Sequence, residues 1–381
     1  MTAPLLFGGA YLGLLAIKLA LAWRYTSLQP PPLARARFAD VTILQPVLGG
    51  DPLLGATLSA NLATLPGARF LWLIDADDGL AREAADGARA AHPLADVELI
   101  VCPPPPEGVN PKLHKLALAE PLVRTPRLAV LDDDATLPAL TLAALLDALD
   151  RGATLATALP LYAHDRDLRS SLVGQFVNNQ SLLTYLPTLV WQPPITINGM
   201  AYALDASAWR ALGGFAPLTH HLTDDLAVAR RVRAAGRKIH QTPEIVRVAT
   251  TIRDTRHYVR LMHRWFLFAT LLVRTEPPAR RVLILGLHGV PPFLLWGALL
   301  ATACAPGPAA LVVLAVVLLA RGGLLLAAQR RLAGATAHAP LASLLAELLQ
   351  PWHLLHAQLD RTIFWRSRRY RVRSATDFSP L

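Results

Sequence analysis

The sequence predicts an α/β protein in which a doubly wound, mostly parallel sheet forms a central water-soluble domain, with transmembrane helices at both the N-terminal and the C-terminal end. Short apolar runs alternate with helical patterns from about residue 40 to residue 250. Long apolar stretches precede and follow this region. The composition agrees, because 53% of the 381 residues are hydrophobic and 17% are charged, which is too apolar for an ordinary soluble enzyme.

The N-terminal stretch 4–23 (PLLFGGAYLGLLAIKLALAW) has the length of a transmembrane helix. A cleaved signal peptide is the alternative, but no small-residue cleavage site follows, and Arg24 and Tyr25 end the segment as residues of a membrane interface do. We therefore expect an uncleaved anchor. Lys18 lies near one end of it, and its ammonium is expected to extend toward the membrane surface.

Two further crossings are predicted late in the chain, at 281–304 and 308–328. Arg321 falls inside the second, where its charge costs about 2.5–3.5 kcal/mol, so we expect it to be displaced to one face or to point into protein. The stretch 340–360 is apolar in its spacing but carries polar residues and Pro351. It is interpreted as an interfacial or re-entrant segment rather than a full crossing.

Charge sets the expected topology. Basic residues follow the first and the third apolar segment and fill the tail 365–373 (WRSRRYRVR), so the positive-inside rule places residues 24–280 and the tail in the cytosol. The net charge of +10 suits anionic lipid headgroups, whereas nucleic acid is not expected, because the basic residues adjoin apolar segments and no recognition module is visible. Two cysteines in unrelated contexts, Cys102 and Cys304, give no disulfide framework, which fits a cytosolic domain.

Within the central region, buried strands are predicted for five apolar runs: 41–47 (VTILQPV), 69–75 (RFLWLID), 96–102 (DVELIVC), 127–134 (RLAVLDDD) and 154–160 (TLATALP). Helical patterns such as 53–65 and 81–92 lie between them. In a sheet of this kind the ligand binds beyond the carboxyl ends of the strands.

Two of these strands end in acidic residues. Asp75, Asp77 and Asp78 follow one, and Asp132, Asp133 and Asp134 follow the other. In an extended chain, residues two apart face the same way, so Asp132 and Asp134 are expected to point into one site while Asp133 points away. Carboxylates so placed suit Mg²⁺ or Mn²⁺, which also holds substrate phosphates. The alternative is a solvated turn whose aspartates cap helices.

A third acidic pair, Asp224 and Asp225, opens an amphipathic helix in HHLTDDLAVARRVRAAGRKI (220–239). A helix N-terminus favours negative charge, so plain capping is again the alternative. Downstream, the stretch 258–273 (YVRLMHRWFLFATLLV) has the apolar face and basic residues of a helix that lies in the plane of the membrane, which suggests a lipid as the second substrate.

The ordered motifs resemble those of inverting, family 2-type glycosyltransferases with the GT-A fold, and more closely those of the ceramide glucosyltransferase group and its bacterial relatives, which include hopanoid glycosyltransferases. The resemblance runs nearly end to end. It rests on VTILQPVLGGDP (41–52), IDADDG (74–79), GVNPKLHKL (108–116), LDDDA (131–135), INGMAYALDASAWRALGGF (197–215), LTDDLAVA (222–229), RHYVRLMHRWFLF (256–268) and LDRTIFWRSRRYRVR (359–373).

This resemblance implies a role for each matching residue. Asp75 binds the uracil or ribose of a UDP-sugar, with Asp77 or Asp78 nearby, and Lys112 lies beside the nucleotide. Asp132 and Asp134 hold the Mg²⁺ or Mn²⁺ that bridges the diphosphate. Asp225 is the catalytic base, with Asp224 as its acidic neighbour. Arg264 and Trp265 match the R-W of a Q/R-x-x-R-W motif, in which Leu261 departs from Gln or Arg; Arg260, one residue early, and His263 are the possible substitutes.

We therefore expect a membrane-bound hexosyltransferase that moves a sugar, glucose in the named group, from a UDP-sugar to a lipid hydroxyl. The acceptor is ceramide or a hopanoid-like lipid; a processive polysaccharide synthase and an inactive membrane scaffold remain as alternatives. The expected regions are an N-terminal anchor (1–25), a cytosolic GT-A catalytic domain (26–252), an interfacial helix region with the R-W motif (253–280), a transmembrane hairpin (281–330), and an interfacial or re-entrant segment with a basic cytosolic tail (331–381).

Overall fold

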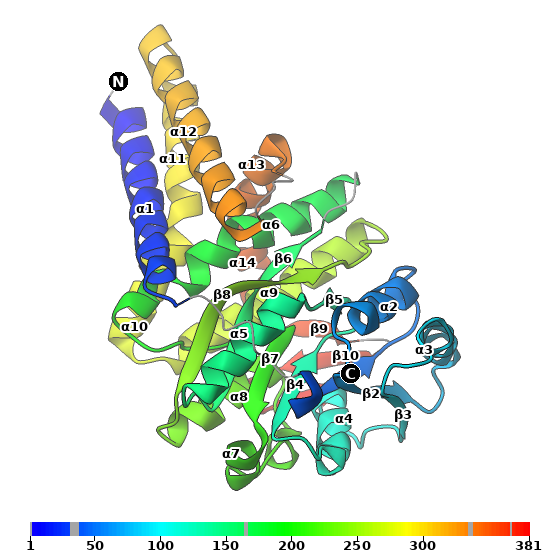
Figure 1. The fold of residues 1–381 in the computed structure, drawn as a ribbon. Helices are drawn as coiled ribbons and strands as arrows, with labels where there is room; N and C mark the ends of the chain where they lie inside the picture. Colours follow the sequence, from blue (N-terminus) through cyan, green and yellow to red (C-terminus); the bar gives the residue numbers. More distant parts are fainter. Residues whose placement is uncertain (1, 31–37, 164–166, 334–337, 366–367) are drawn as a thin grey trace. The chain divides into compact units, whose positions relative to one another are not determined.

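A computed structural model describes residues 2–30, 38–163, 167–333, 338–365 and 368–381 (Figure 1). It divides into two compact units, each described by itself below. We call them the helical unit (Met1–Leu28, His164–Val190 and Ile252–Phe364) and the sheet unit (Gln29–Ala163, Trp191–Thr251 and Trp365–Leu381). Residues 366 and 367 of the basic tail lie outside the described residues.

The sheet unit is built on one mixed sheet with the strand order β3-β2-β1-β4-β7-β6-β8-β5. Neighbours β3, β2, β1 and β4 run parallel, as does the pair β6–β8, while β7 is antiparallel to both β4 and β6. The predicted α/β class is therefore confirmed. The strands are β1 (Val41–Val47), β2 (Arg69–Asp75), β3 (Val97–Cys102), β4 (Arg127–Leu131), β5 (Ala135–Thr136), β6 (Leu155–Tyr162), β7 (Ala201–Asp205) and β8 (Ile239–Val248).

Two features of the sheet differ from the prediction. Strand β4 ends at Leu131, not at residue 134, and a turn follows in which the amide of Ala135 donates to the carbonyl of Asp132 at 3.2 Å. Strands β7 and β8 were not predicted. Strand β7 separates β4 from β6, and its first residue pairs with Leu131, so the segment just before it lies at the edge where β4 ends.

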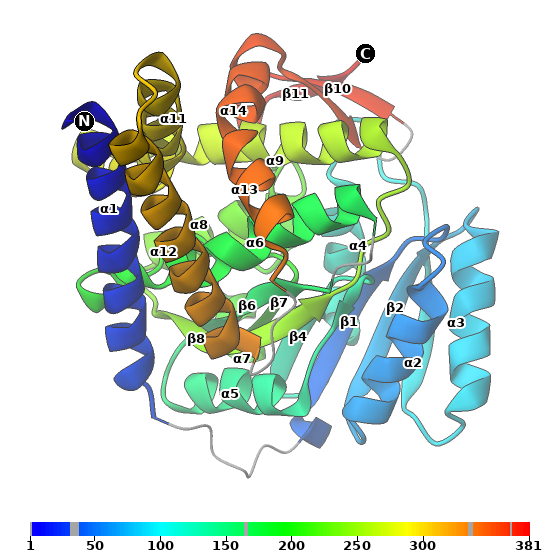
Figure 2. The same cartoon turned by 90° about the horizontal axis from the view of Figure 1, so that it is seen from above.

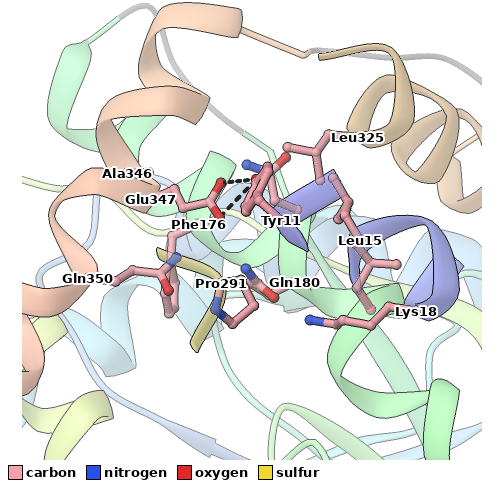
Figure 3. Close-up of a pocket in the computed structure, with 12 residues that line it drawn as sticks. Tyr11, Leu15, Lys18, Phe176, Gln180, Pro291, Leu325, Ala346, Glu347 and Gln350 are labelled. Carbon is pink, nitrogen blue, oxygen red and sulfur yellow. Dashed lines mark hydrogen bonds between the residues drawn. The ribbon is translucent and has the colours of Figure 1, made fainter. Parts of the chain in front are cut away.

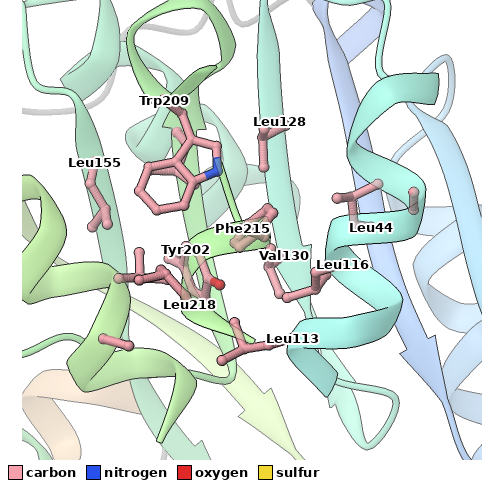
Figure 4. Packing of buried hydrophobic residues seen from close by; sticks show 14 of the residues in the cluster. Leu44, Leu113, Leu116, Leu128, Val130, Leu155, Tyr202, Trp209, Phe215 and Leu218 are labelled. Carbon is pink, nitrogen blue, oxygen red and sulfur yellow. The ribbon is translucent and has the colours of Figure 1, made fainter. Parts of the chain in front are cut away.

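Alternate residues of the strands form the main core of this unit. Leu71 and Leu73, Leu128 and Val130, and Tyr202 and Leu204 are two apart on their strands and face one side of the sheet, as the pleat requires. That side packs against helices α4, α7 and α8 (Figure 4), where the rings of Trp209 and Phe215 lie 5.0 Å apart. The helices are α2 (Leu54–Thr64), α3 (Gly79–Ala91), α4 (Pro111–Ala119), α5 (Ala139–Asp150), α7 (Ala206–Ala211) and α8 (Asp224–Ala234), and β10 (Arg368–Val372) pairs with β11 (Phe378–Pro380).

The helical unit contains, among the described residues, three helices long and apolar enough to cross a membrane: Thr2–Ser27, Pro278–Cys304 and Pro308–Leu332. They correspond to α1 (Thr2–Ser27), to the run of α10 (Pro278–Ile284), a π turn (Leu285–Gly289) and α11 (Val290–Cys304), and to α12 (Pro308–Ala333). Figures 1 and 2 show α1 beside α11 and α12. The π turn precedes Pro291 and Pro292, which lack the N–H groups that would continue the α-helical bonding.

The remaining helices of this unit are shorter or more polar: α6 (Leu168–Tyr185), α9 (Thr255–Thr275), α13 (Pro340–Leu348) and α14 (Gln350–Leu359), followed by β9 (Thr362–Trp365). The stretch 340–360 is thus two helices of 9 and 10 residues, with Pro351 in the first turn of the second. At 1.5 Å per residue, neither is long enough to span a bilayer by itself.

The charges inside the apolar helices lie within protein. Arg321 of α12 is 2% exposed, and its guanidinium contacts Glu347 of α13 at 2.7 Å and donates to the side chain and carbonyl of Ser343. Tyr11 of α1 donates to the same carboxylate at 2.9 Å. Lys18 does not extend to a membrane surface as expected: it is 2% exposed, with its nitrogen 3.4 Å from Nδ1 of His288. The ion pair and hydrogen bonds of Arg321 thus allow α12 to pack among apolar helices although it contains a charged residue.

The Arg321–Glu347 pair gives a stability prediction. Arg321→Met alone leaves a buried carboxylate without its cation and should lower the free energy of unfolding by about 3–5 kcal/mol. The double variant Arg321→Met/Glu347→Met removes both charges and should recover most of that loss. Thermal unfolding of the purified proteins in one detergent measures both effects. A double variant as unstable as the sum of the two single variants would contradict the pairing.

Candidate active site

Asn110 fixes the start of helix α4. Its side-chain oxygen accepts from the amides of Lys112 and Leu113, and Pro111 occupies the first turn, where its missing N–H costs nothing. Its side-chain nitrogen donates to the carbonyls of His221 and Leu222 at 2.9 and 3.2 Å. Asn110 is fully buried, so it ties the start of α4 to the loop that precedes α8.

Lys112 connects three of the sequence motifs. Its ammonium lies 2.7 Å from a carboxylate oxygen of Asp132, 2.7 Å from one of Asp224, and 3.0 Å from the carbonyl oxygen of Gly199. Burial alone lowers the pKa of Lys112, but the two carboxylates outweigh it and raise that pKa well above its usual value. The end of β4, the start of α8 and the segment before β7 therefore converge on one cation.

Lys115, one turn along α4, neutralises the other acidic strand end. It is 1% exposed, and its ammonium lies 3.1 Å from Asp75 and donates to the carbonyls of Val47 and Leu73 at 3.2 and 3.1 Å. Lys115 was not among the site residues predicted from the sequence. Its spacing of three residues from Lys112, which places both lysines on one helix face, was the available signal.

The three aspartates after β4 have three different partners. Asp132 contacts Lys112, Asp133 accepts from the backbone amide of Leu48 at 2.6 Å, and Asp134 accepts from the hydroxyl of Thr250 at 2.5 Å. The expected alternation of an extended chain does not apply, because these residues form a turn. Burial, together with the charges of the neighbouring aspartates, raises the pKa of Asp133 to about 8 and that of Asp134 to about 6. The hydrogen bonds from Leu48 and Thr250 therefore offset only part of the effect of burial on these two carboxyl groups.

Asp225 lies in the first turn of α8, next to Asp224. Burial and the charge of Asp224 raise the pKa of Asp225 to about 7. Gly199 lies directly against it, since a Cβ at position 199 would be 3.2 Å from the Cβ of Asp225. Side chains larger than hydrogen at this position would crowd the acidic pair.

The remaining acidic candidates of the sheet unit, Asp77 and Asp78, do not contact Lys112 or Lys115. Asp77 is exposed. Asp78 caps α3 by accepting from the amide of Ala81, and it also accepts from the amide of Gly49 at 2.8 Å. Asp78 thus has the capping function that was the alternative interpretation of this cluster.

Arg264 and Trp265 belong to α9 of the helical unit, so they are described apart from the aspartates. The ring of Trp265 stacks on Phe176 of α6 at 6.1 Å between centroids. Leu261, at the position where the motif has Gln or Arg, is 8% exposed. Both possible substitutes contact other residues of the helical unit: the Arg260 guanidinium lies 3.9 Å from the centroid of the Phe364 ring, and Nε2 of His263 lies 3.1 Å from the carbonyl oxygen of Thr362.

The turn that contains Asp132, Asp133 and Asp134 could supply one or two carboxylate ligands to a divalent cation. Among the described residues, no group of three or more His, Cys, Asp or Glu side chains is arranged to hold a metal ion by itself. Mg²⁺ in phosphate-binding sites uses only one or two carboxylates, with substrate phosphates and water as the other ligands. Asp132 and Asp134, two residues apart in this turn, offer that smaller set of ligands.

These side chains gather at the carboxyl ends of parallel strands, where α/β proteins bind their ligands. Residues 6–378 match the family model described as glycosyl transferase family 21, so the chain belongs to this family and is a glycosyltransferase. No curated protein sequence matches it.

One solved structure supports the fold, and a second is similar over part of the chain. The mannosyltransferase PcManGT from Pyrobaculum calidifontis, solved in complex with GDP-Man and Mn²⁺, is similar with a TM-score of 0.55 and 19% identity over 94% of this chain and 97% of that one. Glucosyl-3-phosphoglycerate synthase from Mycobacterium tuberculosis, solved with Mg²⁺ and UDP, has a TM-score of 0.36 and 15% identity over 62% and 80%. The former likeness identifies the fold as GT-A-like.

Asn110 provides a test of how the site is held together. Asn110→Ala removes a helix cap and the two bonds to the loop before α8, so it should cost about 1–2 kcal/mol of stability and lower the rate of sugar transfer at least several-fold. Thermal unfolding and initial rates measure the two effects. Asp205→Ala is the matched control, because it removes the cap of α7 beside the opposite end of β4. An equal loss of rate in both variants would contradict the positioning role.

Proposed function

We propose that this enzyme transfers a sugar, glucose in the first instance, from a UDP-sugar to the hydroxyl of a membrane lipid such as ceramide, with inversion at the anomeric carbon. A hopanoid-like lipid is the second acceptor to test. The observation that carries the proposal is the convergence of Asp132, Asp224 and Gly199 on Lys112, with Asp225 beside them. This arrangement places carboxylates that could hold a cation, those of Asp132 and Asp134, in the same site as a carboxylate that could accept a proton, that of Asp225.

The reaction requires a base, an activated leaving group and alignment of the two substrates. We assign the base to Asp225: as the acceptor oxygen bonds to the anomeric carbon, the bond from that carbon to the diphosphate breaks, and the hydroxyl proton passes to the Asp225 carboxylate. A pKa of about 7 suits this role, because a base is most effective when its pKa is near the working pH. Attack opposite the leaving group converts an α-linked donor into a β-glycoside.

We assign the donor to the strand ends. Asp75 and Asp77 would contact the nucleoside, Lys112 would lie beside the nucleotide, and Asp132 and Asp134 would hold Mg²⁺ or Mn²⁺. When bound there, the cation would stabilise the negative charge that develops on the leaving diphosphate. PcManGT binds GDP-mannose and Mn²⁺, so a GDP-sugar belongs among the donors tested.

We assign the acceptor to the membrane on the strength of the three candidate spans and the basic, amphipathic α9. Arg264 and Trp265 would line its path, and the basic tail would hold anionic headgroups. The proposed arrangement has residues 26–252 in the cytosol, next to a bacterial inner membrane.

The deciding experiment offers the detergent-purified protein Mg²⁺ or Mn²⁺ and a panel of radiolabelled UDP-sugars and GDP-mannose, with extracted lipids, ceramide and a hydroxylated hopanoid as acceptors. Label in the lipid extract, dependent on the cation and removed by EDTA, is the expected result. Label in a water-soluble polymer would instead favour a polysaccharide synthase, and no donor consumption with any combination would favour a scaffold.

The base assignment predicts that Asp225→Asn abolishes transfer while donor binding persists. The amide has nearly the same shape as the carboxylate but cannot accept the proton, so the rate should fall by about 10²–10⁴. Initial rates measure the loss, and calorimetric titration with UDP measures the retained binding. Full activity in this variant would remove Asp225 from the role.

The raised pKa predicts a pH dependence. A carboxyl group with a raised pKa stays protonated to a higher pH, so the rate should increase as pH rises through about 7. Asp224→Asn removes the neighbouring charge that helps to raise this pKa, and should shift the acid limb of the profile to lower pH. Rates at saturating donor and acceptor, with thermal midpoints recorded at each pH, test this. An acid limb unchanged in Asp224→Asn would contradict the coupling.

A further inference from the structure

Helix α13 has its polar side chains toward the protein and its leucines away from it. Ser343 and Glu347 are buried, whereas Leu341 is 69% exposed and the three other leucines of this helix are half-buried. In water this arrangement is unfavourable, because apolar surface remains in contact with solvent while polar groups lose it. In hydrocarbon it is the favourable one, since polar side chains there face the interior of a helix bundle.

Helix α14 has the same orientation. Trp352, Leu355 and Leu359 are 60%, 50% and 77% exposed, and their spacing of three and four residues places them on one helix face. Gln350 and His353 are buried. The two consecutive helices therefore both expose bulky apolar side chains and bury polar ones.

Contacts place the junction of α13 and α14 deep among the three candidate spans. Glu347 accepts from the hydroxyl of Tyr11 in α1 at 2.9 Å (Figure 3), and its carboxylate contacts Arg321 in α12 at 2.7 Å. The carbonyl of Leu348 accepts from the indole nitrogen of Trp296 in α11 at 3.0 Å. The end of α13 thus contacts all three spans.

The three partners lie well inside their spans. Tyr11, Arg321 and Trp296 are each at least eight residues from either end of a candidate span of 25–27 residues, which corresponds to about 12 Å of helix. The hydrocarbon core of a bilayer is about 30 Å thick, so residues at this depth lie within it. The end of α13 that contacts them must lie there too. A helix on the membrane surface would instead keep a polar face toward water.

The chain enters and leaves this region from the same side of the membrane. In the proposed arrangement α1 ends in the cytosol, the second span leaves it and α12 returns to it. Residues 365–381 belong to the sheet unit, which the same arrangement places in the cytosol. Helices α13 and α14, with 9 and 10 residues, are each too short to cross in between. Exposed polar residues, Gln358, Asp360 and Arg361, lie at the end of α14, as expected where the chain leaves the hydrocarbon.

We infer that α13 and α14 form a re-entrant element, which enters the bilayer from the cytosolic side beside the three spans and does not cross it. Its lipid-facing residues are Leu341, Trp352, Leu355 and Leu359, which contact acyl chains. The inference rests on the membrane orientation in the proposed function, but not on the sugar donor, the acceptor or the catalytic base.

The re-entrant element is attached to the helix that carries the R-W motif. The hydroxyl of Tyr258 in α9 lies 3.0 Å from Nε2 of His353, and Arg274 of α9 donates to the side chain of Gln358 at 2.9 Å. Insertion of α14 therefore holds α9 next to the lipid phase, from which the acceptor is proposed to come.

Spin-label accessibility tests the inference without turnover. The full-length protein with Cys304→Ser, whose other cysteine is buried, receives Leu341→Cys or Leu355→Cys, a nitroxide label, and phosphatidylcholine–phosphatidylglycerol vesicles. Power saturation then compares collisions with O₂, which dissolves in hydrocarbon, and with a water-soluble nickel chelate. The ratio of O₂ to nickel accessibility should be several-fold higher than at Leu94→Cys, a fully exposed position of the sheet unit, and similar to that at Leu319→Cys on α12.

Two outcomes would overturn the inference. A ratio at both positions equal to that of Leu94→Cys would show that water covers this face. Low accessibility to both reagents would show that protein covers it, for example a second copy of the chain. Since no sugar is transferred in this measurement, a lipid-facing result stands even if the proposed chemistry fails.

A charged substitution provides a second test. Leu355→Asp would place a carboxylate in hydrocarbon and should lower the thermal midpoint in lipid nanodiscs by several degrees, whereas Leu94→Asp, the matched control, should leave it unchanged. Equal midpoints in the two variants would contradict the insertion of α14.

Discussion

The sheet unit depends on the neutralisation of partly or fully buried carboxylates by two lysines of one short helix. Lys112 lies between Asp132 and Asp224, and Lys115 contacts Asp75, so α4 supplies a cation to each acidic strand end. These carboxylates come from segments far apart in sequence, and each is at least partly removed from water, so each is stabilised by a nearby cation. The position of α4 therefore determines whether the acidic groups can share one site at all, and Asn110 fixes that position by bonding both to α4 and to the loop before α8.

The helical unit also pairs each buried charge with a partner from another segment, but here the charge lies inside a long apolar helix. An arginine inside an apolar helix requires a partner at the same depth, and α13 provides Glu347 and Ser343, while α1 provides Tyr11. This set joins the first and last parts of the helical unit. Helix α13 is too short to span a membrane. It nevertheless stabilises α12, which is long enough, because it supplies the partners of Arg321.

The sequence predicted those parts of the fold that depend on local pattern. Strands β1 and β2 begin and end where their apolar runs do, because both faces of a central parallel strand are buried and the run is uninterrupted. Strand β4 was placed three residues too long, because the aspartates after Leu131 form a turn whose partners, such as Leu48 and Thr250, are distant in sequence. Strand β7 was missed for a related reason: AYALD is short, and only its pairing with β4 and β6 makes it a strand.

The same distinction separates the site residues that motifs identify from those that they do not. Asp132, Asp224 and Lys112 stand in recognisable motifs, and the structure brings their charged groups together. Lys115 was overlooked because a buried lysine cannot be distinguished from an exposed one until its carbonyl and carboxylate partners are known. Lys18 was expected at the membrane surface for the converse reason, since a lysine near the end of an isolated apolar helix would extend there. Inside the helical unit, neighbouring helices bury Lys18, and its ammonium lies beside Nδ1 of His288 instead of reaching the surface. Local sequence thus identifies which residues carry charge, whereas the packing of distant segments determines which partners those charges have.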